Sequence, residues 1–276
     1  MDRLRRGWAL TVTSWNVLVG DPGLAVFTVL AALCTFVAAI PFVLPVLIAA
    51  GAKDQTRGGL SIVLLLIFYF VVSFVTIFFN TALVGAALDR LRGGNAGVGA
   101  GLQVALQNLT SIAGFAIISA SVGVILAVIE ERFELVGEII ASIVGAAWSV
   151  ATFLVLPVIV VEREGPFAAI RTSTSMLRRT WGEQIVGTGS IGLIFFLAGL
   201  LGVIPVVLGL VSHVTALTVA GVAFAALYWA GLFLLGSALG QIFRAAVYLY
   251  AQNGVVPVGF DAPLLREAFT QKAKPA

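Results

Sequence analysis

Six long apolar segments alternate with short polar ones along the chain, and this pattern sets the expected fold. All but the third exceed 20 residues, the length that an α-helix needs to cross a bilayer. They show no period-two alternation, which disfavours a membrane β-barrel. The sequence therefore predicts an all-α membrane bundle of six transmembrane helices. The segments cover residues 23–50, 60–88, 111–129, 139–161, 185–211 and 215–240.

Prolines occur inside three of these segments. Pro41 and Pro45 lie in the first, Pro157 in the fourth and Pro205 in the fifth. Proline has no backbone N–H to donate, and its ring clashes with the carbonyl four residues earlier. We therefore expect helices to kink or end at these positions.

Three short segments with helical periodicity precede the pairs of spans. In each, apolar residues recur at spacings of three and four, as on one face of a helix. The stripes are Leu4, Trp8, Thr11, Trp15 and Val19; Leu102, Ala105, Leu106 and Leu109; and Ile170, Thr174, Leu177, Trp181 and Ile185. Arginines lie opposite the first and third stripes: Arg3 and Arg6, then Arg171, Arg178 and Arg179. We expect interfacial elbow helices, with the apolar face in the acyl boundary and the basic face toward anionic headgroups.

Together these features predict one integral membrane domain over residues 1–276. Each of three units would hold an amphipathic elbow helix and two transmembrane helices. The units are 1–88, 96–161 and 166–254, and 255–276 would form a short cytoplasmic tail.

The distribution of charge orients the bundle. With the N-terminus inside, every Lys and Arg falls on the inner side except Lys53, Arg57 and Arg132. This agrees with the positive-inside rule, so we expect both termini to be cytoplasmic in a multi-pass protein of the cell (plasma or inner) membrane. A cleaved signal peptide is the alternative for the N-terminus. The polar Asn16 and Asp21, and an apolar run too long for a signal peptide, disfavour it.

Composition strengthens the membrane assignment and excludes several chemistries. Hydrophobic residues make up 60% of the chain and charged residues 11%, against about 25% charged residues in soluble domains. One Cys and one His exclude disulfides, zinc clusters and Cys/His catalysis within one chain. Phosphate-loop, HExxH and GxSxG motifs are absent from the sequence, so we expect no enzyme, no cofactor and no metal. The basic residues are scattered among span ends, which favours a membrane surface over nucleic acid as their partner.

Four stretches resemble a family of uncharacterised prokaryotic membrane proteins, a domain of unknown function. They are Phe-Phe-Asn-Thr-Ala-Leu at 78–83, residues 148–157 with Glu162, residues 173–182 ending Arg-Arg-Thr-Trp-Gly, and residues 245–254. More distantly, the elbow before the fifth span resembles the membrane domain attached to some glycerophosphodiester phosphodiesterases. The resemblance implies the topology. It transfers no catalytic residues and no phosphodiesterase activity.

Two polar residues within or beside the spans are candidate site residues. Asn80 follows Ser73 and Thr76 on one helix face and either joins helices by hydrogen bonds or contributes to a polar site in the bundle. Arg244 either reaches the inner headgroups or pairs internally with Glu162 or Asp89.

Trp15 and Trp181 are typical of interfacial anchors, with ligand binding as the alternative. Gly236 and Gly240 form a GxxxG motif, suited to packing within the bundle or between chains.

These features favour an integral membrane protein without enzymatic activity that interacts with lipids or with a partner protein. Arg171, Arg178, Arg179, Trp15 and Trp181 would contact anionic headgroups. The alternative is a transporter, channel or lipid scramblase. A proton-coupled relay is disfavoured, because no charged residue lies at the middle of a span. A protein partner or a homo-oligomer remains open.

Overall fold

The computed structural model describes residues 2–50, 58–95, 97–181, 190–254 and 256–260. These residues form ten helices and no strand, so the expectation of an all-α fold is confirmed. The helices are α1 (Asp2–Gly20), α2 (Gly23–Ala50), α3 (Gly58–Leu91), α4 (Val98–Gln107), α5 (Leu109–Ala151), α6 (Val155–Glu162), α7 (Pro166–Trp181), α8 (Ser190–Leu201), α9 (Val203–Val211) and α10 (Thr215–Asn253).

Five stretches of helix among the described residues are long and apolar enough to cross a membrane. This supports a multi-pass membrane protein. The predicted fifth span differs from the other five, because residues 185–189 lie outside the described residues and the remainder divides into α8 and α9 at Gly202. The five stretches are Gly23–Val43, Val63–Leu91, Leu109–Phe133, Val136–Glu162 and Thr215–Gln252, and Phe195–Val211 is a shorter apolar helix.

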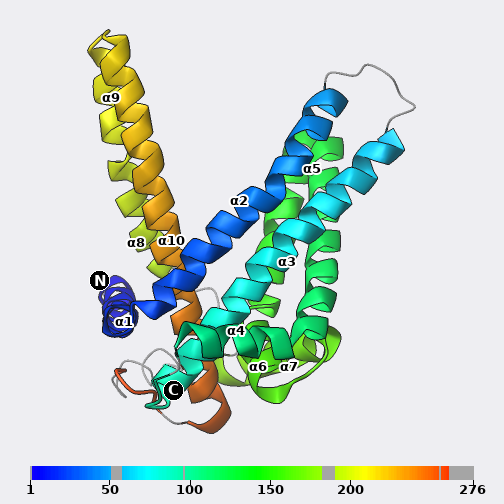
Figure 1. Cartoon of the computed structure of the whole chain (residues 1–276), viewed down its shortest axis with the longest axis vertical. Helices are drawn as coiled ribbons and strands as arrows, with labels where there is room; N and C mark the ends of the chain where they lie inside the picture. The colour runs from blue at the N-terminus through cyan, green and yellow to red at the C-terminus, as the bar shows by residue number, and fades with distance from the viewer. Residues whose placement is uncertain (1, 51–57, 96, 182–189, 255, 261–276) are drawn as a thin grey trace, which may run out of the picture.

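Helix α5 is a hairpin rather than a straight rod. In a straight α-helix, Phe115 and Trp148 would lie about 50 Å apart at 1.5 Å per residue. Their rings are instead 6.4 Å apart and nearly parallel. A Cβ on Gly137 would press on the carbonyl oxygen of Ile129, eight residues earlier. The chain therefore reverses close to Gly137, and the two limbs visible in Figure 1 are the predicted third and fourth spans.

Two of the predicted prolines lie in the first turn of a helix that follows a break. Pro157 is the third residue of α6 and Pro205 the third residue of α9, and each new helix begins after a short break. A missing N–H is harmless in a first helical turn, because the N–H there has no intrahelical acceptor. Pro41 and Pro45 differ, since both lie inside the continuous α2.

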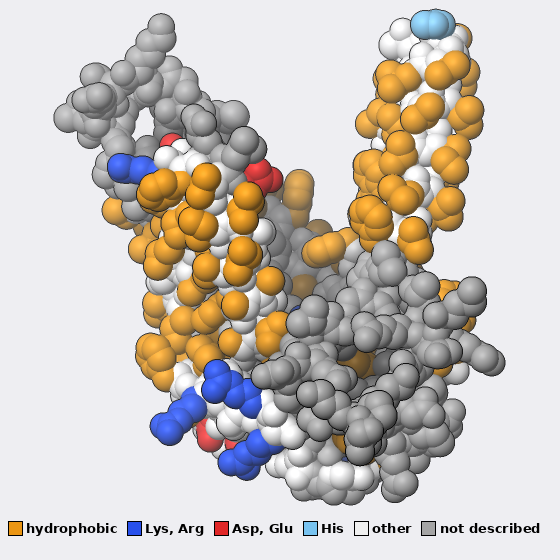
Figure 2. Space-filling model, turned by 180° about the vertical axis from the view of Figure 1, so that it is seen from behind, with side chains coloured by type: hydrophobic (Ala, Val, Ile, Leu, Met, Phe, Trp, Pro, Cys, Tyr) orange, Lys and Arg blue, Asp and Glu red, His pale blue; other side chains and the backbone are white. Residues whose placement is uncertain are grey.

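The helices form two arms that meet at one end. In Figure 1, α8, α9 and the upper half of α10 diverge from the arm of α2, α3 and α5. The arms join where α4, α6, α7 and the lower half of α10 gather, and we call this region the joined end. The core lies there and includes the fully buried Leu83, Ile112, Ile159 and Tyr248. The arms are covered with apolar side chains (Figure 2), which suits hydrocarbon and would be unfavourable in water.

The helices α1, α4 and α7 each precede a pair of apolar limbs. On α7, part of the predicted apolar stripe is buried against protein rather than exposed to lipid. On α7 the most buried residues are Ala169, Ser173 and Leu177, and α7 contacts α5 and α6. On α1 the stripe residues Trp8 and Trp15 are exposed, at 58% and 44%. Thus α7 turns its buried face toward protein, whereas α1 presents tryptophans outward.

The GxxxG motif packs within the chain at one of its two glycines. A Cβ on Gly236 would lie 3.2 Å from the ring of Phe195 on α8. A Cβ on Gly240 would meet no atom of the described residues within 4 Å. Gly236 therefore lets α10 approach α8 closely.

Candidate functional site

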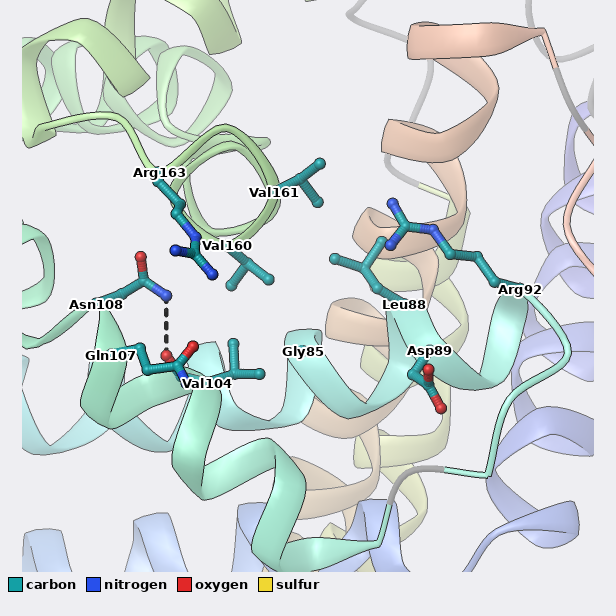
Figure 3. Close-up of a pocket in the computed structure, with 10 residues that line it drawn as sticks. All are labelled: Gly85, Leu88, Asp89, Arg92, Val104, Gln107, Asn108, Val160, Val161 and Arg163. Carbon is teal, nitrogen blue, oxygen red and sulfur yellow. Dashed lines mark hydrogen bonds between the residues drawn. The ribbon is translucent and has the colours of Figure 1, made fainter.

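A polar cavity of about 320 Å³ opens at the joined end, between α3, α4 and α6 (Figure 3). Two arginines, one carboxylate and two amides contribute its polar groups, and four apolar side chains complete the wall. Both arginines are exposed, so the cavity reaches the protein surface. The lining residues are Gly85, Leu88, Asp89, Arg92, Val104, Gln107, Asn108, Val160, Val161 and Arg163.

Two glycines hold α4 against neighbouring helices and so shape one wall. A Cβ on Gly85 would lie 2.8 Å from Cγ1 of Val104, and a Cβ on Gly101 would lie 2.7 Å from the carbonyl oxygen of Ala82. Without side chains at these positions, α3 and α4 approach closely. This packing brings the end of α4, with Gln107, to the cavity.

Asn108 separates α4 from α5 and fixes the polar rim. Its Nδ2 donates a hydrogen bond to the carbonyl oxygen of Val104 at 2.9 Å. In Figure 3 its amide oxygen faces Arg163. Asn108 is buried and hydrogen-bonded, so its amide has a fixed position in the cavity wall.

Arg163 adopts a left-handed backbone conformation at the end of α6, with φ 53° and ψ 32°. For a residue other than glycine this conformation costs about 1–2 kcal/mol. It ends the helical path and directs the side chain to the cavity. In Figure 3 the guanidinium groups of Arg163 and Arg92 enter from opposite walls, with Val161 and Leu88 between them. The carboxylate of Asp89 points away from both.

The residues on either side of Arg163 are anchored by other helices. The hydroxyl of the buried Tyr248 on α10 donates to Oε1 of Glu162 at 2.9 Å. Oγ of Ser111 on α5 donates to the carbonyl oxygen of Glu164 at 3.0 Å. The segment that carries Arg163 is thus held from two directions.

Replacing Tyr248 by phenylalanine should lower the free energy of unfolding by about 1 kcal/mol. The change removes the hydrogen bond to Glu162 while keeping the buried ring. Thermal unfolding in detergent measures the effect. Equal stability of Tyr248→Phe and the parent would contradict the anchoring role.

Residues 59–258 match a family of unknown function (DUF6159). The chain belongs to this family. The expected membership of a family of unknown function is confirmed, and the distant similarity to glycerophosphodiester phosphodiesterase membrane domains stays a prediction. No curated protein and no solved structure matches the chain. The region shared with the family includes every residue that lines the polar cavity.

The predicted headgroup contacts lie outside this cavity. Arg171, Arg178 and Arg179 are exposed on α7, and we call these three residues the basic surface. Trp15 is exposed on α1. The side chain of Trp181 lies outside the described residues.

The two candidate intramembrane residues are in separate surroundings. Asn80 is half-buried on α3. One helical turn earlier, Oγ1 of Thr76 lies 3.4 Å from Oγ1 of Thr35 on α2, so part of the predicted polar stripe joins two helices. The Arg244 guanidinium carbon lies 5.2 Å from the ring centroid of Phe153, within range of a cation–π interaction. Glu162 is a predicted partner of Arg244. Its Oε1 accepts a hydrogen bond from the hydroxyl of Tyr248.

The polar cavity is not evident from the sequence. Arg92 and Arg163 stand out there only as inner charges that orient the bundle. Their positions, far apart in the chain, gave no sign that α4 would bring Gln107 and Asn108 between them. The sequence feature that could have pointed to the cavity is Arg163, a charged residue between the end of a long apolar segment and Gly165.

Proposed function

We propose that this protein is a non-enzymatic integral membrane protein of the cell membrane that binds anionic lipid headgroups at its cytoplasmic face. Both termini and the elbow helices α1, α4 and α7 would lie on that side. The observation that carries the proposal is the basic surface of α7. Arg171, Arg178 and Arg179 are exposed, whereas Ala169, Ser173 and Leu177 on the same helix are buried.

Two further features support a membrane-surface role. Figure 2 shows Lys and Arg side chains gathered at the lower end of one arm, below its apolar flank. Trp8 and Trp15 are exposed on α1, and tryptophan prefers the headgroup level of a bilayer. A basic surface at this level attracts anionic lipids.

Changing Arg171, Arg178 and Arg179 together to glutamine should reduce enrichment of anionic lipid around the protein by about tenfold or more, because each basic residue near an anionic surface contributes about 1 kcal/mol. The measurement is energy transfer from the protein to labelled phosphatidylglycerol in nanodiscs, with labelled phosphatidylcholine as the neutral lipid. Arg132→Gln is the control, since Arg132 is exposed in the hairpin turn of α5. Unchanged enrichment in the triple variant would refute the role of the basic surface.

A transporter, channel or lipid scramblase is the second candidate function. It is favoured by the polar stripe of Ser73, Thr76 and Asn80 on α3. The bond between Thr76 and Thr35 instead supports a packing role for part of that stripe, so we place lipid binding first. Flux of labelled lipid or ions across the membrane of protein-containing liposomes separates the two functions. A protein that only binds lipid headgroups leaves this flux at the level of protein-free liposomes.

A further inference from the structure

The polar cavity has the chemistry of an anion site. Arg92 and Arg163 supply two guanidinium groups from opposite walls, and Asp89 is the single carboxylate among the lining residues. Each guanidinium presents planar N–H groups that match the oxygens of a phosphate in a bidentate arrangement.

The cavity is amphiphilic as well as basic. Leu88, Val104, Val160 and Val161 line it beside the polar groups. Its volume of about 320 Å³ lies at the small end of the range for ligand pockets. It thus has room for a phosphate with a short glycerol-like substituent, and apolar walls for the atoms that adjoin such a group.

The backbone of Arg163 is held in a defined conformation at the rim of the cavity. Its left-handed conformation is one that glycine adopts freely and other residues adopt at a cost. It is a common conformation at helix ends, and Arg163 ends α6. Tyr248 anchors Glu162 and Ser111 anchors Glu164 on either side of it. Arg163 occupies a position where a glycine would be relaxed, and its side chain enters the cavity.

We propose that this cavity binds the phosphate of an anionic lipid headgroup or of a soluble phosphate ester, held between Arg92 and Arg163. The amides of Gln107 and Asn108 are placed to contact the substituent of the phosphate. The site is separate from the basic surface of α7. It would bind one molecule at a defined position, whereas the basic surface attracts a layer of headgroups.

Native mass spectrometry of the full chain, released from mild detergent and titrated with phosphatidylglycerol, tests the proposal. The parent should retain one molecule, and Arg92→Gln and Arg163→Gln should each weaken its binding by about tenfold or more. The double variant should bind no better than the parent binds phosphatidylcholine. Arg132→Gln and the triple variant of the basic surface should retain the single molecule. Loss of this molecule only in the triple variant would overturn the cavity assignment while leaving the proposed function intact.

A second variant separates binding from folding. Arg163→Gly removes the guanidinium and relieves the backbone strain. Its thermal unfolding midpoint without ligand should equal or exceed that of the parent, while its affinity should fall as far as that of Arg163→Gln. Retention of full affinity by this stable variant would overturn the proposal.

The source of the phosphate is resolved by competition. Glycerol 3-phosphate and inorganic phosphate are added to the parent, and the thermal midpoint and the retained lipid are recorded. Displacement of lipid only by other anionic lipids supports a headgroup ligand. Stabilisation by glycerol 3-phosphate that Arg163→Gly abolishes supports a soluble phosphate ester. If neither lipid nor soluble phosphate binds in a manner that depends on Arg92 and Arg163, the proposal is wrong.

Discussion

Replacing Ser173 by alanine should destabilise the protein by about 2–4 kcal/mol. Oγ of Ser173 donates to the carbonyl oxygen of Ala151 at 2.8 Å and accepts from the backbone N–H of Leu154 at 3.1 Å. Both backbone groups lie at the break between α5 and α6, where the helical pattern leaves them without their usual partners. Each buried polar group left unsatisfied costs about 1–3 kcal/mol. Chemical or thermal unfolding in detergent measures the loss.

Ser175→Ala is the matched control on the same helix. Oγ of Ser175 donates within α7, to the carbonyl oxygen of Thr172 at 3.0 Å, and joins no second helix. We expect this variant to lose less than about 1 kcal/mol, because the change leaves no interhelical break unsatisfied. Thr174 Oγ1 lies 3.5 Å from the same Ala151 oxygen and offers only a long contact in place of the serine. Equal effects of the two substitutions would show that Ser173 does not support the break.

The second large effect is expected at Gly101, where alanine should cost about 2–3 kcal/mol. The new Cβ would lie 2.7 Å from the carbonyl oxygen of Ala82, and a backbone atom on a buried helix cannot move aside as a flexible side chain can. Overpacking a well-packed interior costs about 1–3 kcal/mol, and a backbone neighbour favours the upper part of that range. The measurement is the thermal unfolding midpoint in detergent.

Gly99, two residues earlier on α4, provides the control. A Cβ there would meet no atom of the described residues within 4 Å, so Gly99→Ala should be neutral or slightly stabilising through the higher helix propensity of alanine. The pair has a second readout, because displacing α4 would move Gln107 and Asn108 at the polar cavity. Gly101→Ala should therefore weaken phosphate binding as well as stability. Full stability of Gly101→Ala would contradict the close packing of α4 on α3.

The two limbs of the α5 hairpin could be predicted from the sequence, but the turn between them could not. The two apolar runs on either side of the acidic segment around Glu131 indicated two spans, and both limbs are present. The position of the turn could not be predicted, because helical secondary structure runs unbroken from Leu109 to Ala151. The reversal of the chain is evident only from contacts between residues far apart in sequence, such as Phe115 with Trp148.

The buried face of α7 required the tertiary structure for a different reason. Apolar periodicity selected Ile170, Thr174 and Leu177, yet Ser173 is fully buried and Ile170 only partly so. A serine gains from burial here because the break between α5 and α6 supplies an acceptor and a donor. Periodicity along one helix carries no information about helix breaks elsewhere in the chain, so it did not select Ser173.

Properties that depend on local composition can be read from the amino-acid sequence alone. Apolar run length predicts helices that fit a bilayer, and Pro157 and Pro205 mark helix starts through their own missing N–H groups. The polar cavity was decided only by the tertiary structure, since Arg92 and Arg163 lie on opposite walls and α4 reaches them through glycine packing against α3. The physical reason is that hydrophobicity and backbone restriction act within one turn or one run of residues. The position of a charged group relative to another helix depends on how the helices pack.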